Sequence, residues 1–391
     1  MNCGAGEASA RSFGCEFASS CFYPPSFFIF STNFFFTQHI LHLFAFFLIS
    51  KFLLWKKSLE KAARKFYNKI MKKQFARFAI FFIFVAAISA QSTWQFESNL
   101  DFIYYPESDF VSDSNHFAPV SGIFKSVGLQ ETFCAKYVIP TPFGESAFVK
   151  GNNISLGANL IFSPVTIMPT VSVSFTPIAF LNLNAGAAIG TGWQLFGGTF
   201  EGFLGHDEKG EYKQFDAFQT WLYQFWGNAT LMFDAAAIFP GEWNHVVALA
   251  SFDFRYWGIA GEHSGTEVFK WQNTANLAQG TRFDINLLVG YQMPITLSMV
   301  GINFEWSGYF KGDEAFGKNY ENFNGDFVQV DINPLAQISF TQKDILTIML
   351  NFSSRRSFKE RHEKEAEEIF LHYAGREWFF NMIAFRWTHK F

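Results

Sequence analysis

Apolar and polar residues alternate along most of the chain after residue 93. Strict alternation predicts β-strands with one apolar face, because successive side chains of a strand point to opposite faces. In 295–309 the phase shifts near Met299 and Val300, which predicts a β-bulge. The clearest alternating segments are 94–105, 153–162, 167–175, 179–190, 248–256, 282–291, 328–340 and 346–353.

Two architectures share this pattern: a soluble sandwich with its apolar faces inward and a membrane barrel with its apolar faces outward. The predicted strands are about twice the usual soluble length of about 5–6 residues and close to the 9–11 residues of a membrane-crossing strand. Their polar face is rich in small and amide residues, as suits a wet lumen. Aromatic residues near strand ends, such as Tyr104, Trp257 and Tyr309, are typical of interfacial girdles. We therefore predict an all-β, transmembrane, antiparallel up-and-down β-barrel.

Strand number follows from the turns and links. Short turns are expected near Pro164, Pro177, Gly227, Pro294 and Lys343. Long polar links are expected at 106–129, 194–213, 258–280, 310–325 and 354–376. Counting the weaker segments 130–139, 216–225, 229–238 and 266–272 predicts about 14 strands, with 12 next, because such barrels have even numbers of strands.

The start of the chain divides into three parts. Met71–Arg77 is basic, Phe78–Ile88 is an apolar run of 11 residues, and small residues follow, a pattern typical of a secretory signal peptide cleaved after Ala90 or Ser89. We therefore assign 71–90 as signal peptide and 91–391 as the barrel. Residues 1–70 are then upstream sequence that is not part of the product, or else a short N-terminal anchor near 40–55.

The C-terminus has apolar residues at every second position before a terminal Phe. This pattern, carried by Ile383, Phe385, Trp387 and Phe391, resembles the last strand of Gram-negative outer-membrane β-barrels of the porin-like kind; His389 departs from it. The resemblance implies an integral protein of the outer membrane of a Gram-negative-type bacterium. It also implies two partners, outer-membrane lipid and the barrel assembly machinery that reads the terminal strand.

Composition excludes several other classes. The chain is 49% hydrophobic and 16% charged, against about 25% charged in ordinary domains, so disorder is excluded. The net charge of −4 and the lack of long basic runs disfavour nucleic-acid binding. No catalytic motif, metal-ligand spacing or cofactor-binding loop occurs, so we predict a non-enzyme without cofactor. The neighbourhoods of His206 and His263 fit polar loops better than catalytic pairs.

The polar face of the strands carries charges that we expect to line the lumen. They are Glu97, Asp101, Asp253, Arg255, Arg282, Asp284, Glu305 and Asp331. Six acids against two bases favour cations or neutral molecules. The leading hypothesis is therefore a passive channel for small solutes. A closed barrel that acts through its long outer loops is the alternative, and an outer-membrane hydrolase comes third. The solute and the oligomeric state are not predicted.

Overall fold

The computed structural model describes residues 92–391, except 113, 142–148, 150 and 208–210. The predicted signal peptide, its cleavage site at Ala90 and the assignment of residues 1–70 lie outside the described residues. No helix in the described ranges is long and apolar enough to cross a membrane.

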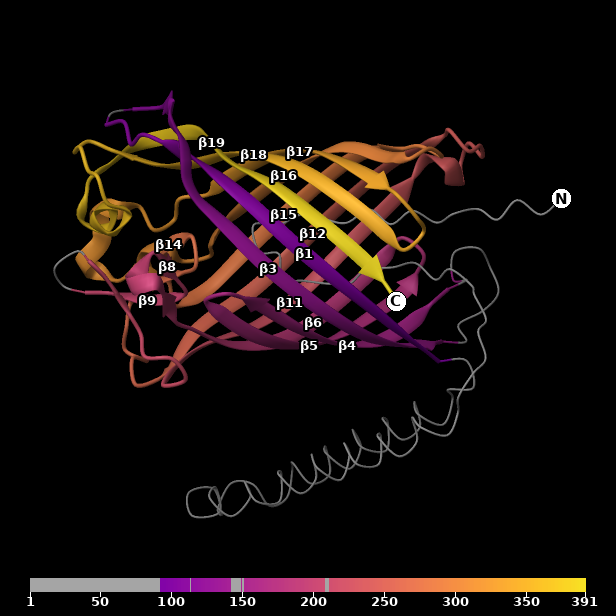
Figure 1. Ribbon diagram of the computed structural model, residues 1–391, viewed down its shortest axis with the longest axis horizontal. Helices are drawn as coiled ribbons and strands as arrows, with labels where there is room; N and C mark the ends of the chain where they lie inside the picture. The colour runs from indigo at the N-terminus through magenta and orange to yellow at the C-terminus, as the bar shows by residue number, and fades with distance from the viewer. Residues whose placement is uncertain (1–91, 113, 142–148, 150, 208–210) are drawn as a thin grey trace, which may run out of the picture. The chain divides into compact units, whose positions relative to one another are not determined.

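Twelve antiparallel strands form a closed barrel (Figure 1). Each barrel strand pairs with the barrel strands before and after it in the sequence. The last strand, β19, pairs with the first, β1, with Glu97 opposite Lys390 and Tyr104 opposite Ile383. A short extra strand, β2 (His116–Phe117), pairs with β19 in parallel. The barrel strands are β1 (Thr93–Ser108), β3 (Val120–Pro140), β4 (Asn153–Ser163), β5 (Thr166–Ile178), β6 (Leu181–Gly192), β11 (Thr220–Asp234), β12 (His245–Gly261), β15 (Gly280–Gln292), β16 (Leu297–Tyr309), β17 (Gln329–Ser339), β18 (Asp344–Phe358) and β19 (Tyr373–Lys390).

The expected strand number of 14 was wrong, and the second choice of 12 is confirmed. The turn expected at Gly227 does not exist, because β11 continues through it and merges segments 216–225 and 229–238 into one strand. A side chain at Gly227 would meet open space, so this glycine marks no close approach. Segment 266–272 contains β13 (Val268–Trp271), which belongs to a smaller sheet rather than to the barrel. The register shift between Leu297 and Met299 confirms the irregularity predicted in β16.

Exposure alternates along the barrel strands. On β1, Phe96 and Phe102 are 50% and 44% exposed, whereas Asp101 is 1% exposed. Eleven of the 12 strands present a large, exposed apolar side chain on the outer face. Such a wide apolar belt requires hydrocarbon to cover it, so the barrel spans a membrane. One exposed residue per strand illustrates the belt: Phe96, Phe133, Leu160, Val171, Leu183, Phe225, Phe252, Leu287, Val300, Leu350 and Trp387.

The two ends of the barrel differ. The start of β1 and the end of β19 lie at one end, which we call the periplasmic end after the usual orientation of outer-membrane barrels. The opposite, outer end carries long connections that fold into an additional structure, which we call the cap (Figure 1). Its elements are β7 (Gln194–Leu195), η1 (Phe196–Gly198), β8 (Phe200–Glu201), β9 (Phe203–His206), β10 (Tyr212–Gln214), β13, β14 (Thr274–Ala278), α3 (Gly312–Phe316), η3 (Lys318–Phe323) and η4 (Glu365–Phe370). At the periplasmic end, η2 (Ala235–Ala237) begins the connection from β11 to β12.

The cap packs against the inner wall of the barrel. Strands β10, β9, β13 and β14 form a four-stranded sheet, from which Phe203 and Phe269 pack against Trp226 and Trp257 of the wall. A second apolar cluster joins Phe316, Phe323 and Ile369 of the cap to Tyr309 and Phe358 at the ends of β16 and β18. The connections at the outer end therefore form one folded unit with cores of its own.

Candidate functional site

The charged residues expected in the lumen lie on the inner face of the barrel. Arg282 and Asp284 are half-buried, and the other six are buried. On the same strands, the apolar residues between these charges face outward. The six buried residues are Glu97, Asp101, Asp253, Arg255, Glu305 and Asp331.

Sequence reasoning missed two basic residues of the inner face, Arg386 on β19 and Lys136 on β3. Arg386 donates two hydrogen bonds to the carboxylate of Asp101, of 2.6 and 2.9 Å. The alternation of Phe385, Arg386 and Trp387 is the signal that could have found this arginine. The excess of acids over bases in the lumen is therefore smaller than the sequence analysis expected.

Two arginines lie opposite each other on β12 and β15, each near an indole ring of the inner wall. Arg255 pairs with Asp253 at 3.2 Å, and its guanidinium lies 5.3 Å from the ring centre of Trp226. The guanidinium of Arg282 lies 5.1 Å from the ring centre of Trp257. Aromatic faces attract guanidinium groups, so these arginines are held against the wall.

A hydrogen-bonded network of amides and carboxylates crosses the inner wall from β16 to β19. Glu305 accepts hydrogen bonds from Asn303 (2.6 Å) and Asn333 (3.0 Å). Asn351 donates to Asp331 (3.2 Å) and to Asn333 (2.6 Å), and Asn381 donates to Asn351 (2.8 Å). Networks of this kind fix their side chains, so this part of the wall presents oriented polar groups.

The inner wall also has an apolar part, which the predicted polar face did not include. Beside the amide network, Leu335 and Met349 lie one inner-face position closer to the periplasmic end than Asn333 and Asn351. They belong to a buried cluster that extends across adjacent strands from β12 to β1. Its members are Ile103, Val247, Leu249, Leu288, Met299, Leu335, Met349, Met382 and Ala384.

Element η4 joins several parts of the cap. Lys125 of β3 and Lys270 of β13 lie 2.8 and 3.5 Å from the carboxylate of Glu365. Asn276 of β14 donates to the backbone oxygen of Glu365 (2.9 Å) and to the side chain of Glu368 (2.8 Å). Burial alone would raise the pKa of Glu365, but the two ammonium groups outweigh it and lower the pKa. This carboxylate therefore holds three chain segments together as an anion.

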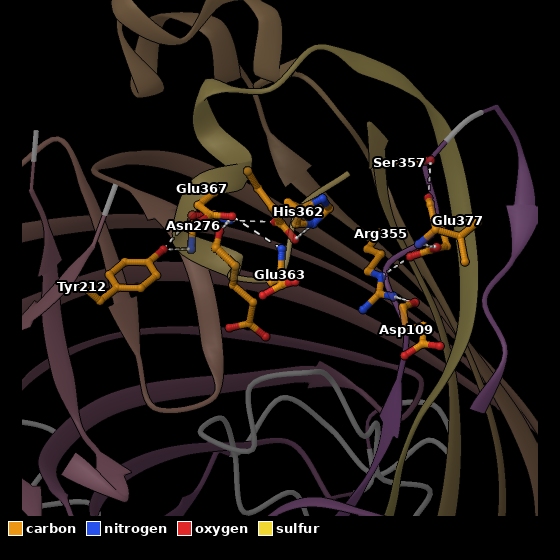
Figure 2. Close-up of polar contacts among 12 residues, drawn as sticks. Asp109, Tyr212, Asn276, Arg355, Ser357, His362, Glu363, Glu367 and Glu377 are labelled. Atoms are coloured by element: carbon orange, nitrogen blue, oxygen red, sulfur yellow. Dashed lines mark hydrogen bonds and ion pairs between the residues drawn. The ribbon is translucent and has the colours of Figure 1, made fainter. Parts of the chain in front are cut away.

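A cavity of about 450 Å³ opens beside η4. Tyr212 borders it, and its hydroxyl donates to the side-chain oxygen of Asn276 (2.6 Å) and accepts from the backbone nitrogen of Asn276 (2.7 Å) (Figure 2). Burial raises the pKa of Tyr212 above its usual value. The cavity therefore combines fixed aromatic and charged groups, as ligand sites do. It is lined by Phe110, Lys125, Glu211, Tyr212, Lys270, Glu363, Lys364, Glu365 and Ala366.

A second polar cluster ties the connection between β1 and β3 to β19. The carboxylate of Glu377 is almost fully buried and binds the guanidinium of Arg355 (Figure 2). The Nε2 atom of His116 lies 2.7 Å from the same carboxylate. Arg355 also donates to the backbone oxygen of Asp109 at 2.7 Å. These contacts hold β2 against β19.

The charged groups of the described residues nowhere bring three or more potential ligands together in a way that could hold a metal ion. Of the acid–His neighbourhood at 206–208, residue 208 lies outside the described residues. His206 contacts the backbone oxygen of Ala366 at 2.7 Å and packs against Tyr212.

No model of a protein family matches the chain, and a comparison with curated protein sequences gives no match. Among solved structures, the chain is similar to the β domain of the Bordetella autotransporter Brka, with 6% identity and a TM-score of 0.34. It is also similar to the outer membrane channel DcaP of Acinetobacter baumannii (8%, 0.33) and to LpxR from Salmonella typhimurium (8%, 0.34). The alignments cover 75%, 78% and 75% of this chain and 98%, 98% and 100% of those chains. At this level the likeness concerns the fold alone.

Proposed function

We propose that this protein is an outer-membrane barrel that acts at the cell surface through its folded cap. The observation that carries the proposal is the packing of the outer connections against the inner wall of the barrel. Phe203, Phe269, Phe316 and Phe323 are at most 1% exposed, so the cap is a packed unit and not a set of separate loops. A barrel with such a cap is suited to binding at its outer end.

The cap cavity is the proposed binding site. It holds three lysines and three glutamates beside Tyr212 and Phe110, so its ligand is small and polar. Most of these charges are already paired within the cap, including Lys364 with Glu211 at 3.6 Å. The pairs leave the site near neutrality, which favours neutral or zwitterionic ligands over strongly charged ones.

A thermal-unfolding screen of the full chain in detergent tests this proposal, with panels of sugars, amino acids and organic acids as probes. A ligand of the cavity should raise the unfolding temperature of wild type but not of Lys270→Met. Lys311→Met is the matched control, because Lys311 is an exposed lysine that pairs with Glu314 and does not line the cavity. The proposal fails if no probe shifts wild type, or if both variants lose the shift equally.

A passive channel for small solutes is the second candidate, favoured by the amide–carboxylate network. With strands about 4.8 Å apart and tilted by roughly 40°, twelve strands give a barrel roughly 24 Å across between backbones, between the filled barrels of about 8 strands and the open channels of about 16–18. Planar bilayers separate the candidates. If the wild-type protein shows no conductance, the function of the cap is favoured. If it shows steps of conductance, the channel is favoured, and Glu305→Gln should then reduce the preference for cations.

A further inference from the structure

Strand β3 has a free edge in its outer half. Toward β1 it is paired from Val138 to Val120, with register shifts on both sides of Gly122, but toward β4 it is paired only from Pro140 to Glu131. No other backbone hydrogen bond within the described ranges involves residues 120–130. Alternate residues of this eleven-residue stretch therefore present unpaired backbone groups along one edge, because successive residues of a strand direct their N–H and C=O groups to opposite sides.

The free edge exists because β4 ends early. Ser163 and Thr166 close the turn between β4 and β5, with their hydroxyl oxygens 2.7 Å apart. The backbone nitrogens of Val165 and Thr166 donate to the Ser163 hydroxyl at 3.2 and 3.0 Å. This tight turn fixes the end of β4, while β1 and β3 continue together as a hairpin that projects from the barrel (Figure 1).

The side chains of this hairpin are unusually exposed. Ile123 is 87% exposed, Phe124 61% and Val120 55%. These residues lie farther along the hairpin than Val127, which pairs with Tyr104. Proteins normally protect such edges with prolines, bulges or several charges. The register shifts around Gly122 give the outer part of this edge such an irregularity, whereas residues 126–130 pair regularly with β1. Here Lys125 is the single charged side chain in 120–130, and its ammonium group pairs with Glu365.

We propose that the edge Val120–Gln130 binds an extended peptide segment of a partner protein outside the cell by β-strand addition. An open edge recognises backbone in the β conformation, and exposed apolar side chains beside it bind alternate side chains of the added strand. The proposal does not depend on a ligand in the cap cavity.

A second copy of this chain in the same membrane does not fit the edge. Barrel strands tilt by roughly 35–45° from the membrane normal. Two copies related by an axis along that normal would bring their β3 edges together at roughly 70–90° to each other, whereas a ladder needs nearly antiparallel strands. The occupant must therefore be a segment free to align with β3.

The test uses the full chain in detergent micelles and a short fluorescent peptide of alternating Val and Thr with a Lys at each end. We expect saturable binding and slower hydrogen exchange confined to residues 120–130. The same peptide N-methylated at every second residue should not bind, because it cannot complete the ladder. Phe124→Lys should weaken binding about tenfold, as expected when a charge blocks an edge. Phe196→Lys, at a cap residue that is 80% exposed, should not weaken it.

Three results would overturn the proposal: no saturable binding to wild type, equal binding of the N-methylated peptide, or equal weakening by Phe196→Lys. Self-association of wild type that Phe124→Lys abolishes, without peptide binding, would also overturn it. If Phe124→Lys does not fold, the comparison of the two peptides on wild type still decides.

Discussion

The ion pair between Asp101 and Arg386 joins the first and last strands, where the barrel closes. Arg386 donates both hydrogen bonds in a fork geometry, and the side chains of Asp101 and Arg386 are 1% and 13% exposed. Arg386→Met would leave the Asp101 carboxylate buried without this partner. Breaking a buried pair costs about 3–5 kcal/mol, whereas replacing both partners with apolar residues of similar size is often nearly neutral. We therefore expect Arg386→Met to lower the free energy of unfolding by about 3–5 kcal/mol and Asp101→Leu/Arg386→Met by much less.

Urea unfolding of the refolded full chain in lipid vesicles, followed by tryptophan fluorescence, measures this difference. Lys311→Met is the control, since Lys311 and Glu314 are each 72% exposed and such a pair contributes at most about 1 kcal/mol. Wild type, both single variants and the double variant form a cycle that isolates the coupling between the two side chains. The reasoning is refuted if Arg386→Met costs no more than the Lys311 variant, or if the double variant is less stable than Arg386→Met.

Three further predictions concern other parts of the molecule. The two lysine partners of Glu365 lower the pKa of its carboxyl group despite burial. The ionised carboxylate should therefore stabilise the cap fully above about pH 4.3, and this stabilisation should be lost as the pH falls through the lower pKa of the folded state. Limited proteolysis of the cap as a function of pH should show the loss, and Glu365→Gln should abolish the pH dependence. Gly186→Ala should cost about 1–3 kcal/mol in urea unfolding, because the new Cβ would lie 2.2 Å from the Trp226 ring, whereas Gly227→Ala should be nearly silent. Phe391→Ala should reduce the amount of protein in the outer membrane, measured by fractionation, while the inserted fraction keeps its resistance to SDS, since Phe391 is 69% exposed.

Alternation predicted strands with two unlike faces, and the length of the strands, the composition of their polar face and the aromatic residues near their ends favoured the barrel over a soluble sandwich. The alternation could not fix the strand number. Gly227 looked like a turn residue, yet β11 continues through it with hydrogen-bonded neighbours on both sides. Residues 120–129 were expected in a link, yet they continue β3. Gly128 interrupts the apolar pattern but pairs regularly with Ile103, and Gly122 still pairs with Glu107 between two register shifts.

The sequence could predict which charged side chains face the lumen, but not which residues they contact. Parity places Asp101 and Glu305 inward, but only the register between strands shows that Asp101 meets Arg386, 285 residues away, or that Glu305 meets Asn333. The apolar part of the inner wall was hidden for a different reason. Leu335 lies between polar inner-face residues, and a single apolar residue there does not alter a polar pattern. It becomes a cluster only when neighbouring strands align it with Met349 and Leu288.

The cap shows why the sequence predicted only long polar links between these strands. Their polar and charged residues dominate the composition, yet each connection also carries a few large apolar residues without a steady period. Phe203, Phe269, Phe323 and Ile369 are fully buried, and each comes from a different connection. No single connection could bury such side chains alone, so their burial requires the connections to fold together. Lipid contact explains only the outer face of the barrel, so the shared packing at the outer end has another physical cause: each connection buries its apolar side chains against the others and against the inner wall.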